Sequence, residues 1–84
     1  MMATNPGIFA RIGRYPGTLG GEPVIVGTRL PVRAIVLTTR YAPDSEYIYG
    51  AYPFVSREDI DEALAYYETH RSEIERYIAE KRRR

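Results

Sequence analysis

Three acidic residues and the only histidine of the chain are the first candidates for chemistry. Asp59, Asp61 and Glu62 stand close together in the sequence, and His70 follows them. Carboxylates and an imidazole can hold a metal ion or exchange protons. On a helix, however, Asp59 and Glu62 lie one turn apart while His70 lies two turns further on, so the set does not converge as a HExxH zinc site does. We interpret these residues as solvated charges of a helix face and predict no enzyme activity, no metal and no cofactor.

Charge is unevenly distributed along the chain, although the net charge is only +1. Residues 1–43 carry five arginines and one glutamate, a balance of +4, residues 44–80 carry three arginines and ten acids, a balance of −7, and residues 81–84 add +4. Paired across a dimer, the basic residues of the first segment could grip a nucleic-acid backbone or a minor groove. The alternative is that they are solvated surface charges. The candidate DNA-binding residues are Arg11, Arg14, Arg29, Arg33 and Arg40.

Tyrosine is frequent, with eight residues in a chain that has no tryptophan. The tyrosines at 47, 49 and 52 and those at 66 and 67 are interleaved with acids and not with bases. This pattern favours a protein interface or a half-buried core over stacking on unpaired bases. The basic tail could be a solvated terminus, or it could bind carboxylates or phosphates. The candidate partner-binding residues are Tyr47, Tyr49, Tyr66, Tyr67, Lys81, Arg82, Arg83 and Arg84.

The segment that precedes these residues predicts a compact, hairpin-like β arm. Residues 15–18 read YPGT and residues 20–21 are a glycine pair, and both favour tight turns. Residues 24–26 form a short β-branched run that Gly27 closes, which predicts a strand.

Helices are predicted for the rest of the chain. The first covers residues 31–42 and begins at a proline, and the second covers residues 45–52 with Asp44 as its N-cap. The third begins after Ser56, and Asp59 completes its capping box. The apolar positions expected to face the core are Val32, Ile35, Val36, Ile60, Ala63, Leu64, Tyr67, Ile74, Tyr77 and Ile78.

The length of the third helix is open to two interpretations. His70 and Arg71 interrupt its apolar face, and residues 72–75 form a second capping box at which a new helix could start. Because no glycine or proline breaks the segment, we predict one long helix over residues 57–81. A helix that projects so far beyond a small body needs a packing partner, which favours a dimer or another protein.

The length of 84 residues predicts one domain with one modest core. We expect a flexible arm at residues 1–10, a single domain at 11–80 with a β arm at 11–30 and a helical part at 31–80, and a basic tail at 81–84. No apolar run approaches the roughly 20 residues of a membrane span and no secretory signal is apparent, so we expect a cytoplasmic protein. The absence of cysteine excludes disulfides, which leaves oligomerisation as the means of strengthening a small core.

Four motifs of the chain resemble one family. They are PVIxGTRLPV at residues 23–32, YP at 52–53, EDI at 58–60 and ALAYY at 63–67. Over residues 11–78 the chain is similar to the bacterial and archaeal domain-of-unknown-function 433 (DUF433) family. The resemblance implies a VapB-type antitoxin with a short β arm and a three-helix, homeodomain-like helix-turn-helix, encoded beside a PIN-like ribonuclease toxin. This chain departs from the family at Ala42, where members tend to have glycine. A positive φ at this position would strain an alanine.

In a helix-turn-helix protein the third helix enters the major groove. Its exposed N-terminal positions here are Arg57, Glu58, Asp61 and Glu62, so phosphate repulsion would oppose that docking. We therefore expect an antitoxin-like, dimeric regulatory protein that neutralises a PIN-like ribonuclease and can bind operator DNA through its basic N-terminal half. Tail guanidinium groups would pair with the carboxylates that hold the catalytic metals of the nuclease. The alternative is a dimeric protein-interaction module that has neither a DNA target nor a toxin partner.

Overall fold

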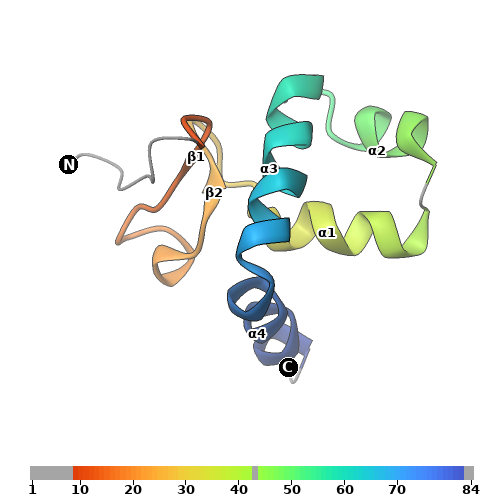
Figure 1. Ribbon diagram of the computed structural model, residues 1–84. Helices are drawn as coiled ribbons and strands as arrows, with labels where there is room; N and C mark the ends of the chain where they lie inside the picture. The colour runs from red at the N-terminus through yellow and green to blue at the C-terminus, as the bar shows by residue number, and fades with distance from the viewer. Residues whose placement is uncertain (1–8, 43, 83–84) are drawn as a thin grey trace.

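The computed structural model describes residues 9–42 and 44–82, which form a short antiparallel hairpin followed by four helices (Figure 1). The elements are β1 Ile12–Gly13, the 3₁₀ turn η1 Leu19–Gly21, β2 Val24–Ile25, α1 Val32–Tyr41, α2 Ser45–Ala51, α3 Arg57–Thr69 and α4 Arg71–Arg82. The predicted class, mainly helical with an N-terminal hairpin, is therefore confirmed. Most of the arm predicted at residues 1–10, and Arg83 and Arg84 of the tail, lie outside the described residues.

The hairpin is short, and the Gly27–Thr28 pair of the PVIxGTRLPV motif turns the chain after its second strand. Its strands pair Ile12 with Ile25 and Gly13 with Val24. After β2 the chain turns through Gly27, whose φ of 83° lies in the left-handed region that glycine adopts without steric penalty. The hydroxyl of Thr28 donates to the carbonyl of Ile25 at 2.8 Å. The GT pair of the motif thus forms a turn that returns the chain towards α1.

Local signals set the helix starts. The side chain of Asp44 accepts a hydrogen bond from the N–H of Glu46 at 3.0 Å, and Ser56 and Asp59 form the predicted reciprocal capping box. Helix α1 begins at Val32, one residue later than predicted. Ala42 follows α1 with a φ of −147°, so the strain considered for an alanine at this position does not arise.

The core lies where α1, α3 and α4 meet the hairpin. α3 crosses α1 near the start of α1, and α2 lies above α1 in this view (Figure 1). Phe9 precedes the predicted domain boundary at residue 11, yet it is 7% exposed and packs edge-on against Tyr66 at 5.2 Å between ring centroids. The buried apolar residues are Phe9, Ile12, Val24, Ile25, Leu30, Val32, Ile35, Val36, Ile48, Ile60, Ala63, Tyr66, Ile74 and Ile78.

The prediction of one long helix over residues 57–81 is wrong. α3 ends at Thr69, and His70 has φ −134° and ψ 35°, outside the helical region. α4 then starts at Arg71, one residue before the second capping box, and the N–H of Ile74 donates to the carbonyl of His70 at 3.1 Å. The break turns α4 back towards α1 and buries Ile74 and Ile78, which a straight helix would carry away from the body.

Candidate partner-binding surfaces

Arg11, a candidate DNA-binding residue, is held against α3 by two carboxylates. Its Nη1 lies 3.0 Å from Oδ1 of Asp59, and its backbone N–H donates to Oε2 of Glu62 at 2.6 Å. Burial alone would raise the pKa of Asp59, but hydrogen bonds from Ser56 and Arg11 outweigh it, and the pKa is lowered. Arg11 therefore joins the start of the hairpin to α3.

Arg14 makes an equivalent connection to the start of α4. Its Nη1 lies 2.5 Å from Oε2 of Glu73, and its Nη2 donates to the hydroxyl of Tyr66 at 2.5 Å. The hydrogen bond to Glu73 is the main reason why the pKa of Arg14 is raised. Burial would raise the pKa of Glu73, but the hydrogen bond and charge of Arg14 outweigh it and lower that pKa.

Arg33 is the partner of the one buried charged residue among the described residues. Glu22 has no exposed surface, and its Oε1 accepts a 2.7 Å hydrogen bond from Nε of Arg33. The other carboxylate oxygen, Oε2, has no hydrogen-bond partner among the described residues. Sequence reasoning missed Glu22, because a single glutamate in a glycine-rich loop gives no signal of burial.

The two remaining candidate arginines differ from each other. Arg40 donates to both Glu75 and the hydroxyl of Tyr67, which ties α1 to α3 and α4. Hydrogen bonds from Tyr67 and from Arg40 lower the pKa of Glu75. Arg29 is exposed and forms no ion pair with any described residue. Four of the five candidate DNA-binding arginines are thus engaged with carboxylates of the same chain.

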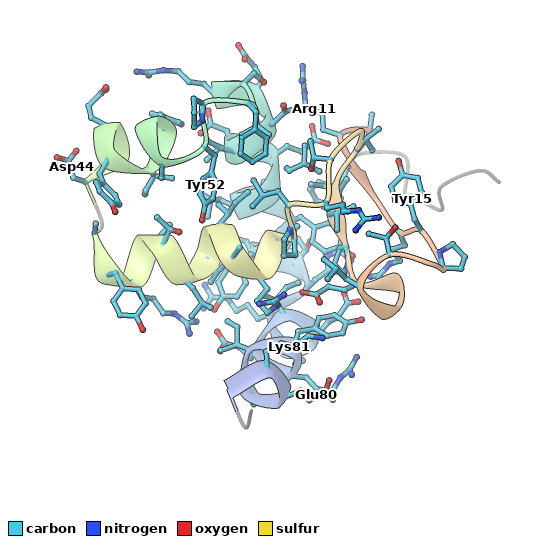
Figure 2. The ribbon with its side chains drawn as sticks, turned by 180° about the vertical axis from the view of Figure 1, so that it is seen from behind. Arg11, Tyr15, Asp44, Tyr52, Glu80 and Lys81 are labelled. Atoms are coloured by element: carbon cyan, nitrogen blue, oxygen red, sulfur yellow. The ribbon has the colours of Figure 1, made fainter. Side chains whose placement is uncertain are left out.

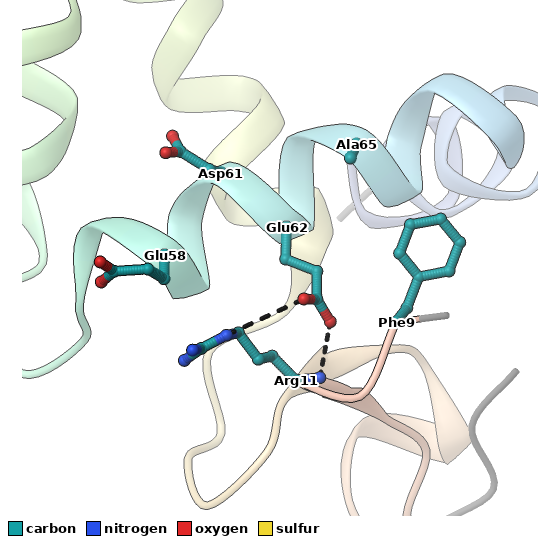
Figure 3. A pocket seen from close by; sticks show the side chains of 6 residues that line it. All are labelled: Phe9, Arg11, Glu58, Asp61, Glu62 and Ala65. Atoms are coloured by element: carbon teal, nitrogen blue, oxygen red, sulfur yellow. Dashed lines mark hydrogen bonds and ion pairs between the residues drawn. The ribbon is translucent and has the colours of Figure 1, made fainter. Parts of the chain in front are cut away.

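One face of α3 carries an open, acidic groove of about 450 Å³ (Figure 3). Phe9 and Ala65 contribute apolar surface, and Arg11 reaches across to Glu62. The other two lining residues, Glu58 and Asp61, form no ion pair with any residue of the described ranges. Three of the four positions that a helix-turn-helix protein would present to DNA, those of Glu58, Asp61 and Glu62, therefore line an acidic groove in this fold.

Aromatic side chains are exposed around α2. Tyr41 at the end of α1, Tyr47 on α2 and Phe54 in the connection to α3 are 82%, 57% and 65% exposed. Tyr47 was among the predicted partner-binding residues. The other two were missed, because a tyrosine at a helix end and a phenylalanine in a loop have no periodic pattern to mark them.

Two other tyrosines of this region face inward. The hydroxyl of Tyr49 donates to Oδ1 of Asp61 at 2.7 Å, so this candidate partner-binding residue is half-buried against α3. The hydroxyl of Tyr52 lies 2.6 Å from that of Thr38 (Figure 2 labels Tyr52 between α1 and α2). Thr38 thus fastens α1 to the chain after α2.

Tyr66 is a core residue and not a surface residue. Tyr66 is 1% exposed, and the imidazole of His70 stacks on its phenol ring at 3.9 Å between centroids. Burial and the nearby charge of Glu73 raise the pKa of Tyr66 to about 12. Tyr67, predicted for the core and for partner binding, is half-buried and bonded to Glu75 and Arg40.

The basic tail begins on α4. Lys81 is exposed, and Figure 2 places Glu80 and Lys81 at the opposite end of the molecule from Arg11. α4 includes Arg82 as its last residue. Lys81 and Arg11 therefore belong to different surfaces of the molecule.

Neither a metal site nor a membrane span occurs in residues 9–42 and 44–82. No group of three or more potential ligands converges there: Asp59 and Glu62 are bonded to Arg11, Asp61 accepts a hydrogen bond from Tyr49, and His70 stacks on Tyr66. No helix in these ranges has the length and apolar character to cross a bilayer.

Comparisons with known proteins agree with the fold. A family model described as "Protein of unknown function (DUF433)" matches residues 12–67. The crystal structure of a DUF433 member protein from Anabaena variabilis ATCC 29413 superposes with a TM-score of 0.76 at 33% sequence identity, covering 82% of this chain and 68% of that one. No protein of curated function matches the chain at a significant level.

Proposed function

The chain belongs to the DUF433 family, and on that premise we propose that it is a non-catalytic, antitoxin-like regulator that acts by binding a PIN-like ribonuclease toxin. The observation that carries the proposal is the exposure of Tyr41, Tyr47 and Phe54 within a short stretch around α2. Large exposed aromatic side chains are typical of the energetically dominant positions in protein interfaces.

The ion pairs that the candidate arginines form within the chain favour a protein partner over nucleic acid. Arg11, Arg14, Arg33 and Arg40 each bond to a carboxylate of the same chain. A side chain that contacts phosphate must be free to replace counterions, and these four would first have to leave their partners. Contact with operator DNA is therefore a secondary part of the proposal, for which Arg29 is the available residue of the set.

The tail provides the inhibitory contact in this proposal. Guanidinium groups pair bidentately with carboxylates, and PIN-like nucleases hold their metals with clustered carboxylates. Tail arginines would occupy those carboxylates while the aromatic residues around α2 supply the affinity. In the absence of the toxin, the chain forms a homodimer in this proposal.

Co-expression of the tagged chain with the product of the adjacent gene tests this function. We expect the two proteins to co-purify, with a chain that ends at Glu80 still binding but failing to inhibit RNA cleavage. Failure of the full-length chain to retain the neighbouring product would reject the toxin link, and a dimeric interaction module without DNA or toxin would then take its place.

A further inference from the structure

The groove on α3 holds negative charge that the fold does not neutralise. Glu58, Asp61 and Glu62 line it, and Arg11 is the one basic residue among its lining residues. Arg11 is already paired with Asp59 and Glu62, and Asp61 accepts only a neutral hydrogen bond from Tyr49. Two carboxylates, those of Glu58 and Asp61, therefore lack a positive partner within residues 9–42 and 44–82.

Repulsion between these carboxylates destabilises the folded chain as long as the groove is empty. Glu58 lies three residues before Asp61 and four before Glu62, and like charges at these spacings repel on a helix surface. The positive end of the helix offsets part of this repulsion for Glu58, in the first turn, but Asp61 lies beyond that turn. A basic ligand would relieve the repulsion and would also cover the apolar surface of Phe9 and Ala65.

The chain itself contains a segment of the required chemistry. Residues 81–84 read KRRR and carry four positive charges, whereas residues 44–80 carry a net charge of −7. The stems of lysine and arginine can cover apolar surface while their charged ends meet carboxylates. We propose that the acidic groove on α3 receives the basic C-terminal tail of a second copy of this chain.

A second copy can bring its tail to the groove while both chains keep their fold, whereas the start of the tail lies far from the groove of its own chain. Figure 2 places Lys81 and Arg11, which lines the groove, at opposite ends of the molecule. Two copies related by a two-fold axis can each insert their tail into the groove of the other, so that both contacts form together.

The resulting dimer is weak and sensitive to salt. Two short tails bury much less surface than the 1,200 Å² or so typical of stable interfaces, and their charges are screened at high ionic strength. The proposal does not depend on a toxin partner, since both contacting surfaces belong to this chain. A toxin that captures the tail would compete with this self-association.

Sedimentation velocity over a range of protein concentrations tests the inference. At about 50 mM NaCl the full chain should self-associate, and at about 500 mM NaCl the apparent dissociation constant should rise at least about tenfold. A chain that ends at Glu80 should remain monomeric at both salt concentrations. Self-association of the truncated chain equal to that of the full chain, or a full chain that is monomeric throughout, would overturn the proposal.

A charge exchange separates the proposed contact from a general effect of charge. One variant carries Glu58→Lys and Asp61→Lys, and the other carries Arg82→Glu, Arg83→Glu and Arg84→Glu. Each alone should be monomeric, because its groove and tail have the same sign, while an equimolar mixture should restore the heavier species. Circular dichroism checks that both variants are folded. A mixture of two folded variants that stays monomeric would refute the pairing of tail with groove.

Discussion

The buried carboxylate of Glu22 accepts a 2.7 Å hydrogen bond from Nε of Arg33, and this pair fastens the hairpin to the first turn of α1. Taking a carboxylate out of water is costly, and Arg33 compensates only one of its two oxygens. The sequence alone suggests that Arg33 is a free surface arginine, but its ion pair with the buried Glu22 stabilises the fold.

Removal of one member of this pair should be more harmful than removal of both. We expect Arg33→Leu to lower the free energy of unfolding by about 3 kcal/mol, because it leaves a buried, uncompensated carboxylate. The double variant Glu22→Leu with Arg33→Leu should recover most of that loss. Urea unfolding followed by circular dichroism measures both. Losses that simply add would show that the two side chains are not coupled.

The two phenylalanines of the chain provide a matched comparison. Phe9 is buried against Tyr66 while Phe54 is 65% exposed. Phe9→Ala should lower the free energy of unfolding by about 3 kcal/mol, whereas Phe54→Ala should change it by less than about 0.5 kcal/mol. Equal effects in thermal or urea unfolding would mean that Phe9 is not part of the folded domain.

The protein should lose stability in acid through its ion pairs. The pKa values of Asp59, Glu73 and Glu75 are lowered in the folded state, so their contribution is present above the carboxylate pKa of the unfolded chain and is lost as the pH falls through the folded pKa. The free energy of unfolding should therefore decrease from about pH 5 downwards.

Substitution of either residue of the Arg14–Glu73 ion pair tests whether this pair contributes to the loss of stability in acid. Glu73→Gln and Arg14→Gln both remove the pair that lowers the pKa of Glu73, so each should flatten the acid limb of a plot of unfolding free energy against pH. If both variants keep the wild-type slope, this pair is not a source of the acid sensitivity.

DNA binding should be weak and general. Fluorescence anisotropy with a duplex from the region upstream of the gene should give a dissociation constant in the non-specific range of about 10⁻⁴ to 10⁻⁶ M near physiological salt, with a steep salt dependence. Arg29→Ala should weaken it more than Arg40→Ala, because Arg40 is paired with Glu75. Nanomolar, sequence-selective binding would contradict this prediction and would make operator binding the main function.

The helix caps, turns and buried helix faces that depend on residues close together in the sequence could be predicted from it. Asp44 and Ser56 act as N-caps because each needs only backbone groups one turn away. The left-handed turn at Gly27 and the buried face of Val32, Ile35 and Val36 follow from equally local rules.

Contacts between residues far apart in the sequence, and the helix break that depends on them, could not be predicted. Arg11 and Arg14 contact their acids and Tyr66 about fifty to sixty positions along the chain, so composition alone suggests that they form a free basic surface. The break at His70 carries no glycine or proline signal. It forms because burial of Ile74 and Ile78 against the rest of the body favours a turn that helix propensity alone opposes.

Inhibition of the ribonuclease product of the adjacent gene is the most direct test of the central claim. Wild-type protein should inhibit RNA cleavage at a stoichiometric ratio, Tyr47→Ala with Phe54→Ala should need about tenfold to hundredfold more protein, and Val26→Ala, at an exposed position of the hairpin, should inhibit like wild type. Full inhibition by the double variant would show that the aromatic residues around α2 are not the binding surface. Unaltered cleavage in the presence of excess wild-type protein would contradict the antitoxin function itself.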